Sequence, residues 1–130
     1  MTSKQISPEI SQFIHERIQS VEQLDVLFLL ARDPSRLWTA EQVASELRST
    51  PTSIRRWLDN LRTQKLLIQN EPFSFVFAPE DPALVTLIDL LRDIYPQQRV
   101  RIIEMIFNKP AFRLESFANA FRWREDDKDG

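Results

Sequence analysis

Apolar residues recur at three- and four-residue spacing along most of the chain, which is the periodicity of amphipathic helices. The first stripe follows Ser-Pro-Glu at positions 7–9, a typical helix start with an N-cap serine and a proline at the first helical position. The stripe consists of Ile10, Phe13, Ile14, Ile18 and Val21. A second helix is predicted after Ser20, because Gln23 completes a capping-box pattern, and its apolar residues surround it, so it should be buried. Asp-Pro-Ser at 33–35 ends it.

The next segment predicts a short extended piece, two helices and a hairpin. Leu-Trp-Thr at 37–39 is extended, with Trp38 packing there, and Thr39 with Gln42 repeats the capping-box pattern. Helices are predicted at 40–48, with Val43, Ala44 and Leu47 on one face, and at 51–64. "LLIQ" and "FSFVFA" then predict a β-hairpin in which Phe73, Phe75 and Phe77 form the core side.

The C-terminal third predicts further helices. Asp81-Pro82 caps one with Leu84, Leu87, Ile88, Leu91 and Tyr95 on its apolar side, and Pro96 breaks or kinks it. The run 99–108 continues with Val100, Ile103, Ile106 and Phe107. Leu114, Phe117, Ala118 and Phe121 form a last stripe, which is either a packed helix or a partner-binding segment. The charged tail 123–130 is expected to be disordered.

Composition narrows the class of protein. The only glycine is the last residue, which excludes Gly-rich phosphate-binding loops. With no cysteine and a single histidine, His15, no zinc cluster can be assembled. A Ser-His-Asp arrangement would have to use His15, and no serine lies in a nucleophile-elbow context, so we expect a non-enzyme with no catalytic residues, metal or cofactor. No apolar run is long enough to span a bilayer, and the N-terminus lacks a signal peptide, so we expect a cytoplasmic protein without membrane contact.

The order of elements is helix, short strand, helix, turn, helix and two-stranded hairpin. The carrying segment is "LDVLFLLARDPSRLWTAEQVASELRSTPTSIRRWLDNLRTQKLL", and within 26–78 the sequence resembles the MarR-like and ArsR-like bacterial regulators. In that pattern Ala44 lets two helices pack closely, and Ile54, Leu58 and Leu61 pin the third helix. The resemblance implies a winged helix-turn-helix fold, mainly α with a small β-hairpin. It also implies dimers that bind double-stranded operator DNA through the third helix and the wing.

Two positions depart from the family pattern. The glycine that commonly precedes the first strand of the wing is replaced by Lys65 or its neighbour. The wing also lacks the arginine or lysine that commonly reaches DNA. Any DNA contact is therefore expected to come mostly from the third helix, 51–64.

The outer face of helix 51–64 carries the candidate DNA-binding residues. Near the bases we expect Thr52, Ser53, Arg55, Arg56 and Asn60, since arginine pairs with guanine and asparagine with adenine. Arg48, Arg62 and Lys65 are placed for phosphates. Asp59 has the wrong sign for this role, and the alternative is an ordinary solvated face whose arginines pair with acids. Trp57 is expected to be a partly buried packing residue.

A protein-docking function remains open beside transcriptional control. In that alternative, the acidic Phe-rich hairpin or the C-terminal helices dock another protein and no DNA is bound. We expect an N-terminal helix at 1–20, the winged helix-turn-helix at 21–80, and C-terminal helices at 81–122 with the tail 123–130. The C-terminal helices, together with the first helix, either form a homodimer interface, which we favour, or complete the core of one monomer.

Overall fold

The structure is a computed structural model that describes residues 5–108, so the stripe 114–121 and the tail 123–130 lie outside the described residues. The helices are α1 (Pro8–Arg17), α2 (Val21–Arg32), α3 (Ala40–Leu47), α4 (Pro51–Thr63) and α5 (Pro82–Phe107). The strands are β1 (Trp38–Thr39), β2 (Leu67–Asn70) and β3 (Ser74–Phe77). The element order is the one that the sequence predicts, and the mainly helical winged-helix class is confirmed.

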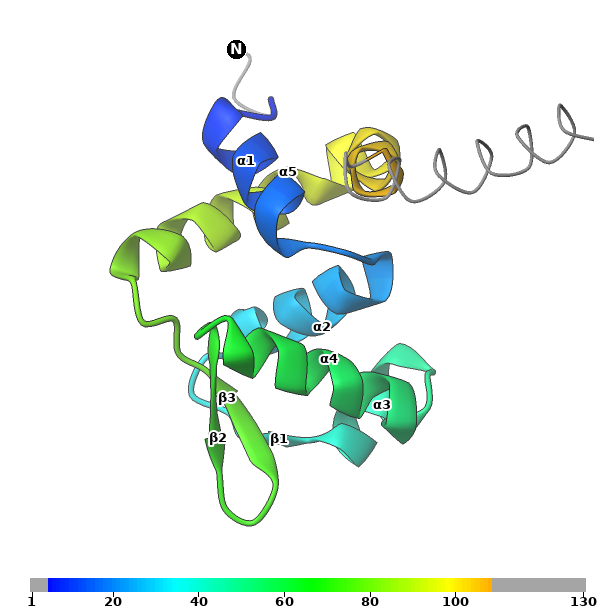
Figure 1. The fold of residues 1–130 in the computed structure, drawn as a ribbon, viewed down its shortest axis with the longest axis vertical. Helices are drawn as coiled ribbons and strands as arrows, with labels where there is room; N and C mark the ends of the chain where they lie inside the picture. The colour runs from blue at the N-terminus through cyan, green and yellow to red at the C-terminus, as the bar shows by residue number, and fades with distance from the viewer. Residues whose placement is uncertain (1–4, 109–130) are drawn as a thin grey trace, which may run out of the picture.

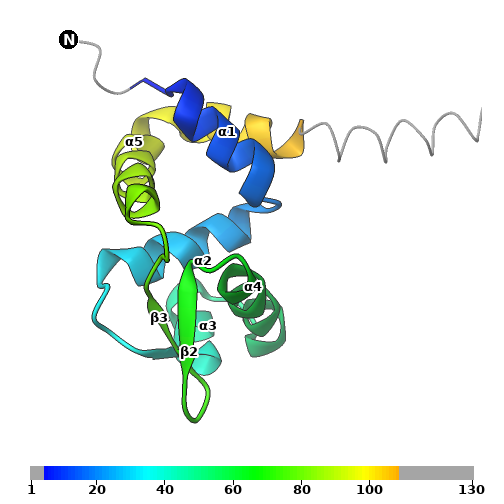
Figure 2. The ribbon, with the colours of Figure 1, turned by 60° about the vertical axis from the view of Figure 1, so that its left-hand side comes forward.

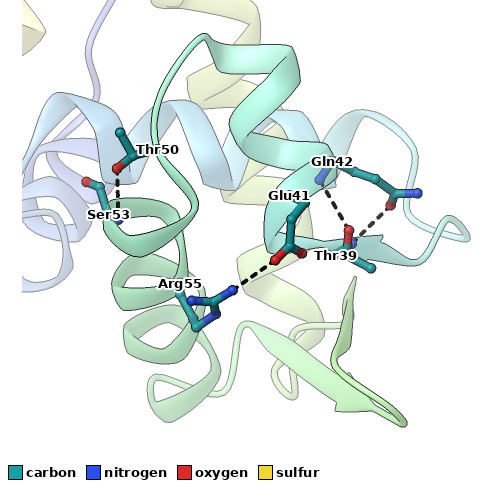
Figure 3. A network of polar contacts seen from close by, with 6 residues as sticks. All are labelled: Thr39, Glu41, Gln42, Thr50, Ser53 and Arg55. Carbon is teal, nitrogen blue, oxygen red and sulfur yellow. Dashed lines mark hydrogen bonds and ion pairs between the residues drawn. The ribbon is translucent and has the colours of Figure 1, made fainter.

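Side-chain caps begin the helices where the sequence predicts them. The Ser7 hydroxyl accepts a hydrogen bond from the Ile10 amide at the start of α1. Both predicted capping boxes form, Ser20 with Gln23 on α2 and Thr39 with Gln42 on α3. Figure 3 shows the second of these, together with the bond that Thr50 accepts from the Ser53 amide at the start of α4. These caps satisfy amide groups that a helix leaves without partners in its first turn.

Helix α2 lies between two layers of the molecule. Helices α3 and α4 pack on one side of it with the hairpin, and α1 and α5 lie on the other side (Figures 1 and 2). Because both layers bury residues against it, α2 is apolar nearly all round, as predicted. One continuous core joins the layers, with Leu24, Leu27, Leu30, Ile54, Leu58, Leu61, Ile88 and Leu91 fully buried.

The sheet has three antiparallel strands in the order β1-β3-β2. Trp38 pairs with Phe75, and Leu67 pairs with Phe77 at the base of the hairpin. Trp38 is only 1% exposed, so it packs at the short strand as predicted. Strand β2 forms one edge of this sheet, and its residues after Leu67 are exposed.

The prediction that three phenylalanines form the core side of the hairpin is wrong for one of them. Phe75 and Phe77 are each 5% exposed, whereas Phe73 is 73% exposed. Residues two apart share a face only within a strand, and β3 begins at Ser74. Phe73 belongs to the turn, where no sheet face directs it inward.

The predicted apolar stripe after Pro96 is right for Ile106 and wrong for Val100 and Phe107. Helix α5 runs through Pro96 and is kinked at Gln98, which has non-helical φ and ψ of −116° and 22°. The side chains buried beyond the kink are Ile102 and Ile106, while Val100 is 71% and Phe107 53% exposed. Beyond the kink, packing against the core decides which face is buried, and the short apolar run has candidates on more than one face. Within residues 5–108, no helix has the length and apolarity needed to cross a membrane.

Candidate nucleic-acid interface

Helix α4 has an apolar inner face and a polar outer face. Ile54, Leu58 and Leu61 are fully buried, whereas Thr52, Arg55, Arg56 and Asp59 are exposed. Trp57 is partly buried against the core, as predicted. The pattern arises because apolar residues recur at three- and four-residue spacing, which matches the helical repeat.

The turn between α3 and α4 is closed by a residue in the left-handed region. Arg48 is the C-cap of α3 with φ 57° and ψ 47°, and the Ser49 amide donates to the Ala44 carbonyl. Ala44 is 4% exposed in this tight junction, consistent with the small residue that the sequence indicated. The Arg48 side chain is exposed beside the first turn of α4.

Most cations around α4 have an acidic neighbour. Arg55 Nη2 lies 3.0 Å from Glu41 Oε2 at the start of α3 (Figure 3). Arg62 pairs with Asp59, and Lys65 Nζ lies 3.7 Å from Glu80 Oε1. Arg56 instead lies over the Trp57 ring, 5.0 Å from its centroid. Exposed ion pairs contribute about 0–1 kcal/mol each, so a stronger anionic partner can displace them.

Only part of the predicted base-contacting set comes together on the outer face. Thr52, Arg55 and Arg56 line a hollow of about 700 Å³ that Glu41 and the hairpin's Phe73 also border. The Ser53 hydroxyl donates to Glu22, and Asn60 Oδ1 accepts hydrogen bonds from Gln23 and Gln64. These two side chains are therefore engaged inside the fold rather than presented on the outer face.

Glu22, near the start of α2, collects three donors from the α4 side. Its carboxylate accepts hydrogen bonds from the Ser49 and Ser53 hydroxyls and from the Trp57 indole N–H, the last at 3.1 Å. Burial opposes ionisation of this carboxyl, but the three hydrogen bonds and the nearby Arg56 outweigh it and hold its pKa below 4.5. No local sequence pattern identifies this residue, because its partners lie far along the chain.

Gln23 is the one fully buried polar residue among those described, and all its hydrogen-bonding atoms are used. Its carbonyl oxygen accepts from the Gln19 and Ser20 amides. Its amide group donates to the Arg17 carbonyl at 3.0 Å and to Asn60 Oδ1 at 2.7 Å. The capping-box pattern identified Gln23 in sequence, but not its bond across to α4.

The hairpin beside this face carries no lysine or arginine between 66 and 80. Its exposed side chains include Ile68, 50% exposed, and Phe73. The edge formed by β2 lines a second hollow of about 820 Å³ together with Arg62 and Glu71. Among residues 5–108, no cluster of three histidine, aspartate or glutamate side chains could hold a metal ion.

Comparison with known proteins gives a structural likeness and no sequence relative. No protein-family model matches the chain, and no curated protein sequence is similar to it. Among solved structures, the chain is similar to MepR, a transcription regulator of the Staphylococcus aureus multidrug efflux pump MepA. That alignment has a TM-score of 0.49 and 15% identity, and it covers 91% of this chain and 90% of MepR.

A mutant MepR from a multidrug-resistant S. aureus clinical isolate aligns with a TM-score of 0.50 and 15% identity, over 92% of this chain and 86% of that one. MepR is a MarR-family winged-helix regulator, which is one of the two groups that the sequence resembles. At this identity the likeness establishes the winged-helix fold of the chain.

Proposed function

We propose that the protein is a DNA-binding transcription regulator that inserts α4 into the major groove. The observation that carries this proposal is the outer face of α4, where Thr52, Arg55 and Arg56 project together from the first turns of the third helix of a winged-helix fold. Residues near the N-terminus of such a helix are the ones that reach base edges in helix-turn-helix proteins. The fold of the MepR structures, which are transcription regulators, supports the same function.

The proposed DNA contacts are of two kinds, those to bases and those to phosphates. Arg55 and Arg56 are proposed to contact bases, since a guanidinium pairs with guanine through two hydrogen bonds. Arg48, Arg62 and Lys65 are exposed or partly exposed around α4 and are proposed to contact phosphates. Ser53 and Asn60 are left out of the base-contacting set, because their side chains are engaged with Glu22 and Gln23.

A homodimer acting in the cytoplasm completes the proposal. Leu90 and Val100 on α5 are 51% and 71% exposed, which leaves apolar surface for a second copy to cover. A twofold dimer would present two copies of α4 to a palindromic site. The C-terminal helices and α1 are the proposed interface.

DNA binding titrated against salt tests the function. We expect the wild-type protein to bind duplexes selected from a random-sequence library, with affinity that falls steeply as salt rises. Exchanging both Arg55 and Arg56 for glutamate should abolish selection and flatten the salt dependence. The matched control exchanges Arg32 and Arg36 for glutamate, the same charge change at exposed positions at the end of α2 and after it, outside α4 and the proposed interface. Equal loss in both double variants, or no binding by the wild type at low salt, would contradict the proposal.

The exposed hairpin favours a second candidate, a module that docks another protein. Phe73 is 73% and Ile68 50% exposed on a hairpin without cations and with Glu71 at its turn. Such a surface suits an apolar segment with positive charge better than it suits a phosphate backbone. In this alternative α4 serves only as scaffold.

The two functions separate in a single variant. Replacing Ile68 with serine removes an exposed apolar side chain of the hairpin that does not border the hollow lined by Arg55 and Arg56. If the protein is a DNA-binding regulator acting through α4, selected duplexes should bind this variant as tightly as wild type. If it is a docking module, no duplex is selected, and a partner recovered with the wild-type protein is lost with the Ile68→Ser variant.

A further inference from the structure

Two consecutive residues at the start of α2 hold both halves of α4. Glu22 binds the N-terminal half through Ser53, Trp57 and the preceding Ser49. Gln23 binds the C-terminal half through Asn60, which in turn accepts a bond from Gln64 at 2.9 Å. Apolar contacts hold α4 against the core but allow small rotations of the helix about its axis. Hydrogen bonds restrict these rotations, because they depend on the angle between donor and acceptor. The pair, called here the α2 clamp, therefore defines how α4 is turned about its axis.

The α2 clamp also connects α4 to the junction between α1 and α2. Gln23 donates to the Arg17 carbonyl at the end of α1, and Gln64 Nε2 donates to the same carbonyl at 3.0 Å. Arg17 Nη1 reaches back to the Gln64 carbonyl at 3.4 Å. Helix α1 packs on α5, so the C-terminal end of α4 is bonded directly to the α1–α5 layer.

None of the clamp residues lies on the outer face of α4. Glu22 and Gln23 are partly and fully buried on the inner side, opposite to Thr52 and Arg55. A contribution from them to DNA binding would act through the orientation of α4 and not through contact. A small change in the orientation of α4 should weaken sequence-specific binding more than non-specific binding, because base contacts tolerate less displacement than phosphate contacts.

We propose that Glu22 is a positioning residue that sets the rotation of α4 for base recognition, with Gln23 holding the other half of the helix. This inference rests on the proposed DNA-binding function for its effect on affinity. The orientation of α4 relative to α2 does not depend on that function. The experiments therefore measure affinity for DNA and the orientation of α4 separately.

The test compares Glu22→Ala and Glu22→Gln with Glu9→Ala, a control that removes one exposed carboxylate from α1. Affinity is measured by fluorescence anisotropy for the tightest duplex selected by the wild type and for a shuffled duplex of equal length. We expect Glu22→Ala to lose roughly tenfold or more for the selected duplex, the scale of one lost base-pair contact. Binding to the shuffled duplex should match the Glu9→Ala control. Glu22→Gln keeps the side-chain shape and one acceptor oxygen, so it should recover part of the loss.

Residual dipolar couplings of backbone amides measure the orientation of α4 directly, and the Trp57 indole N–H reports its bond to Glu22. In Glu22→Ala, we expect the α4 couplings to deviate from the wild-type orientation and the Trp57 N–H to exchange faster, while the buried Trp38 is unchanged. Unchanged α4 couplings in both Glu22 variants would overturn the proposal, as would equal losses for selected and shuffled duplexes. If the wild type binds no duplex, the DNA-binding function fails, and the couplings alone decide whether the α2 clamp orients α4.

Discussion

Lys65 illustrates a residue placed against its own conformational preference. It follows the C-cap of α4 with φ 66°, and the Leu66 amide donates to the Leu61 carbonyl across it. For a residue with a Cβ, the left-handed region costs roughly 1–2 kcal/mol. The family pattern has glycine near this position, which removes that cost. The ion pair of Lys65 with Glu80 is about 70% exposed on both sides and offsets little of it.

Replacing Lys65 with glycine should therefore raise the free energy of unfolding by about 0.5–1 kcal/mol, because relief of the backbone outweighs the added entropy of the unfolded chain. Urea unfolding followed by circular dichroism measures it. The control is Thr63→Gly inside the last turn of α4, which should destabilise by about 0.3–0.5 kcal/mol, the difference in helix propensity between the two residues. If Lys65→Gly destabilises the protein as much as the control does, the left-handed backbone at position 65 carries no free-energy cost.

The carboxyls of Glu22 and Asp25, one turn apart on α2, should affect stability in opposite directions. The pKa of Glu22 is lowered in the folded protein, so its contribution is present above pH 4.5 and is lost as pH falls through the folded pKa. Burial raises the pKa of Asp25, against the attraction of Arg99, so its ionised form destabilises the fold above pH 3.8.

Urea unfolding across the acidic range checks both signs. Glu22→Gln should be less stable than wild type at neutral pH, with a difference that shrinks below pH 4.5. Asp25→Asn should be at least as stable as wild type at neutral pH. The exposed Glu9→Gln serves as control and should follow wild type throughout. A constant deficit of Glu22→Gln at every pH would instead point to lost shape complementarity.

At the scale of the element, the outer face of α4 is partly neutralised by its neighbour α3. Glu41 in the first turn of α3 holds Arg55 at 3.0 Å, so DNA must compete with a carboxylate for this guanidinium. The pair fixes Arg55 toward the start of α3 in the free protein (Figure 3). The ion pair is weak because both side chains are exposed, but removing it would free the Arg55 guanidinium to contact DNA.

If α4 reads DNA, Glu41→Gln should raise affinity for the selected duplex by about three- to tenfold at low salt, because Arg55 is released and one repulsive charge is lost. Anisotropy titrations measure it. Glu46→Gln makes the same charge change on an exposed position of α3, and it separates release of Arg55 from net charge. Equal gains in the two variants would mean that the pair does not restrain Arg55.

The extent to which sequence predicts these elements depends on the range of the interactions that form them. Helix starts at Ser7, Ser20 and Thr39 were predictable, because caps act over three residues. The inward roles of Ser53 and Asn60 were not, since Glu22 and Gln23 stand some thirty residues earlier in the chain. The stripe beyond Pro96 was right for Ile106 but wrong for Val100, because the direction of the helix after the kink at Gln98 depends on distant packing.

At the scale of the whole molecule, the long helix α5 leaves apolar side chains uncovered. Tyr95 packs on Phe28 of α2, whereas Leu90 and Val100 are exposed. The order of elements and the burial of α2 followed from the sequence pattern. The outward side of α5 did not, because which face is covered depends on packing between distant helices.

We expect the wild-type protein to sediment as a dimer at micromolar concentration and the double variant Leu90→Glu, Val100→Glu to sediment as a monomer, since charge at an apolar interface is unfavourable. Analytical ultracentrifugation measures the sedimentation. Phe73→Ser removes an exposed apolar side chain from the hairpin and should leave the dimer intact. A monomeric wild-type protein would exclude α5 as a dimer interface.

The two-residue strand β1 has a consequence for how the protein folds. Its pairing with β3 encloses α3, α4 and β2 in one long loop, whereas β2 and β3 are joined by a short turn. Closing a long loop is slow and entropically unfavourable until the helices inside it are formed. The hairpin should thus form early and locally, and the Trp38–Phe75 pairing should arise only with the completed helical core. Because this pairing forms last, it should also open first, so the amides of Trp38 and Thr39 should exchange through local opening before those of the helical core.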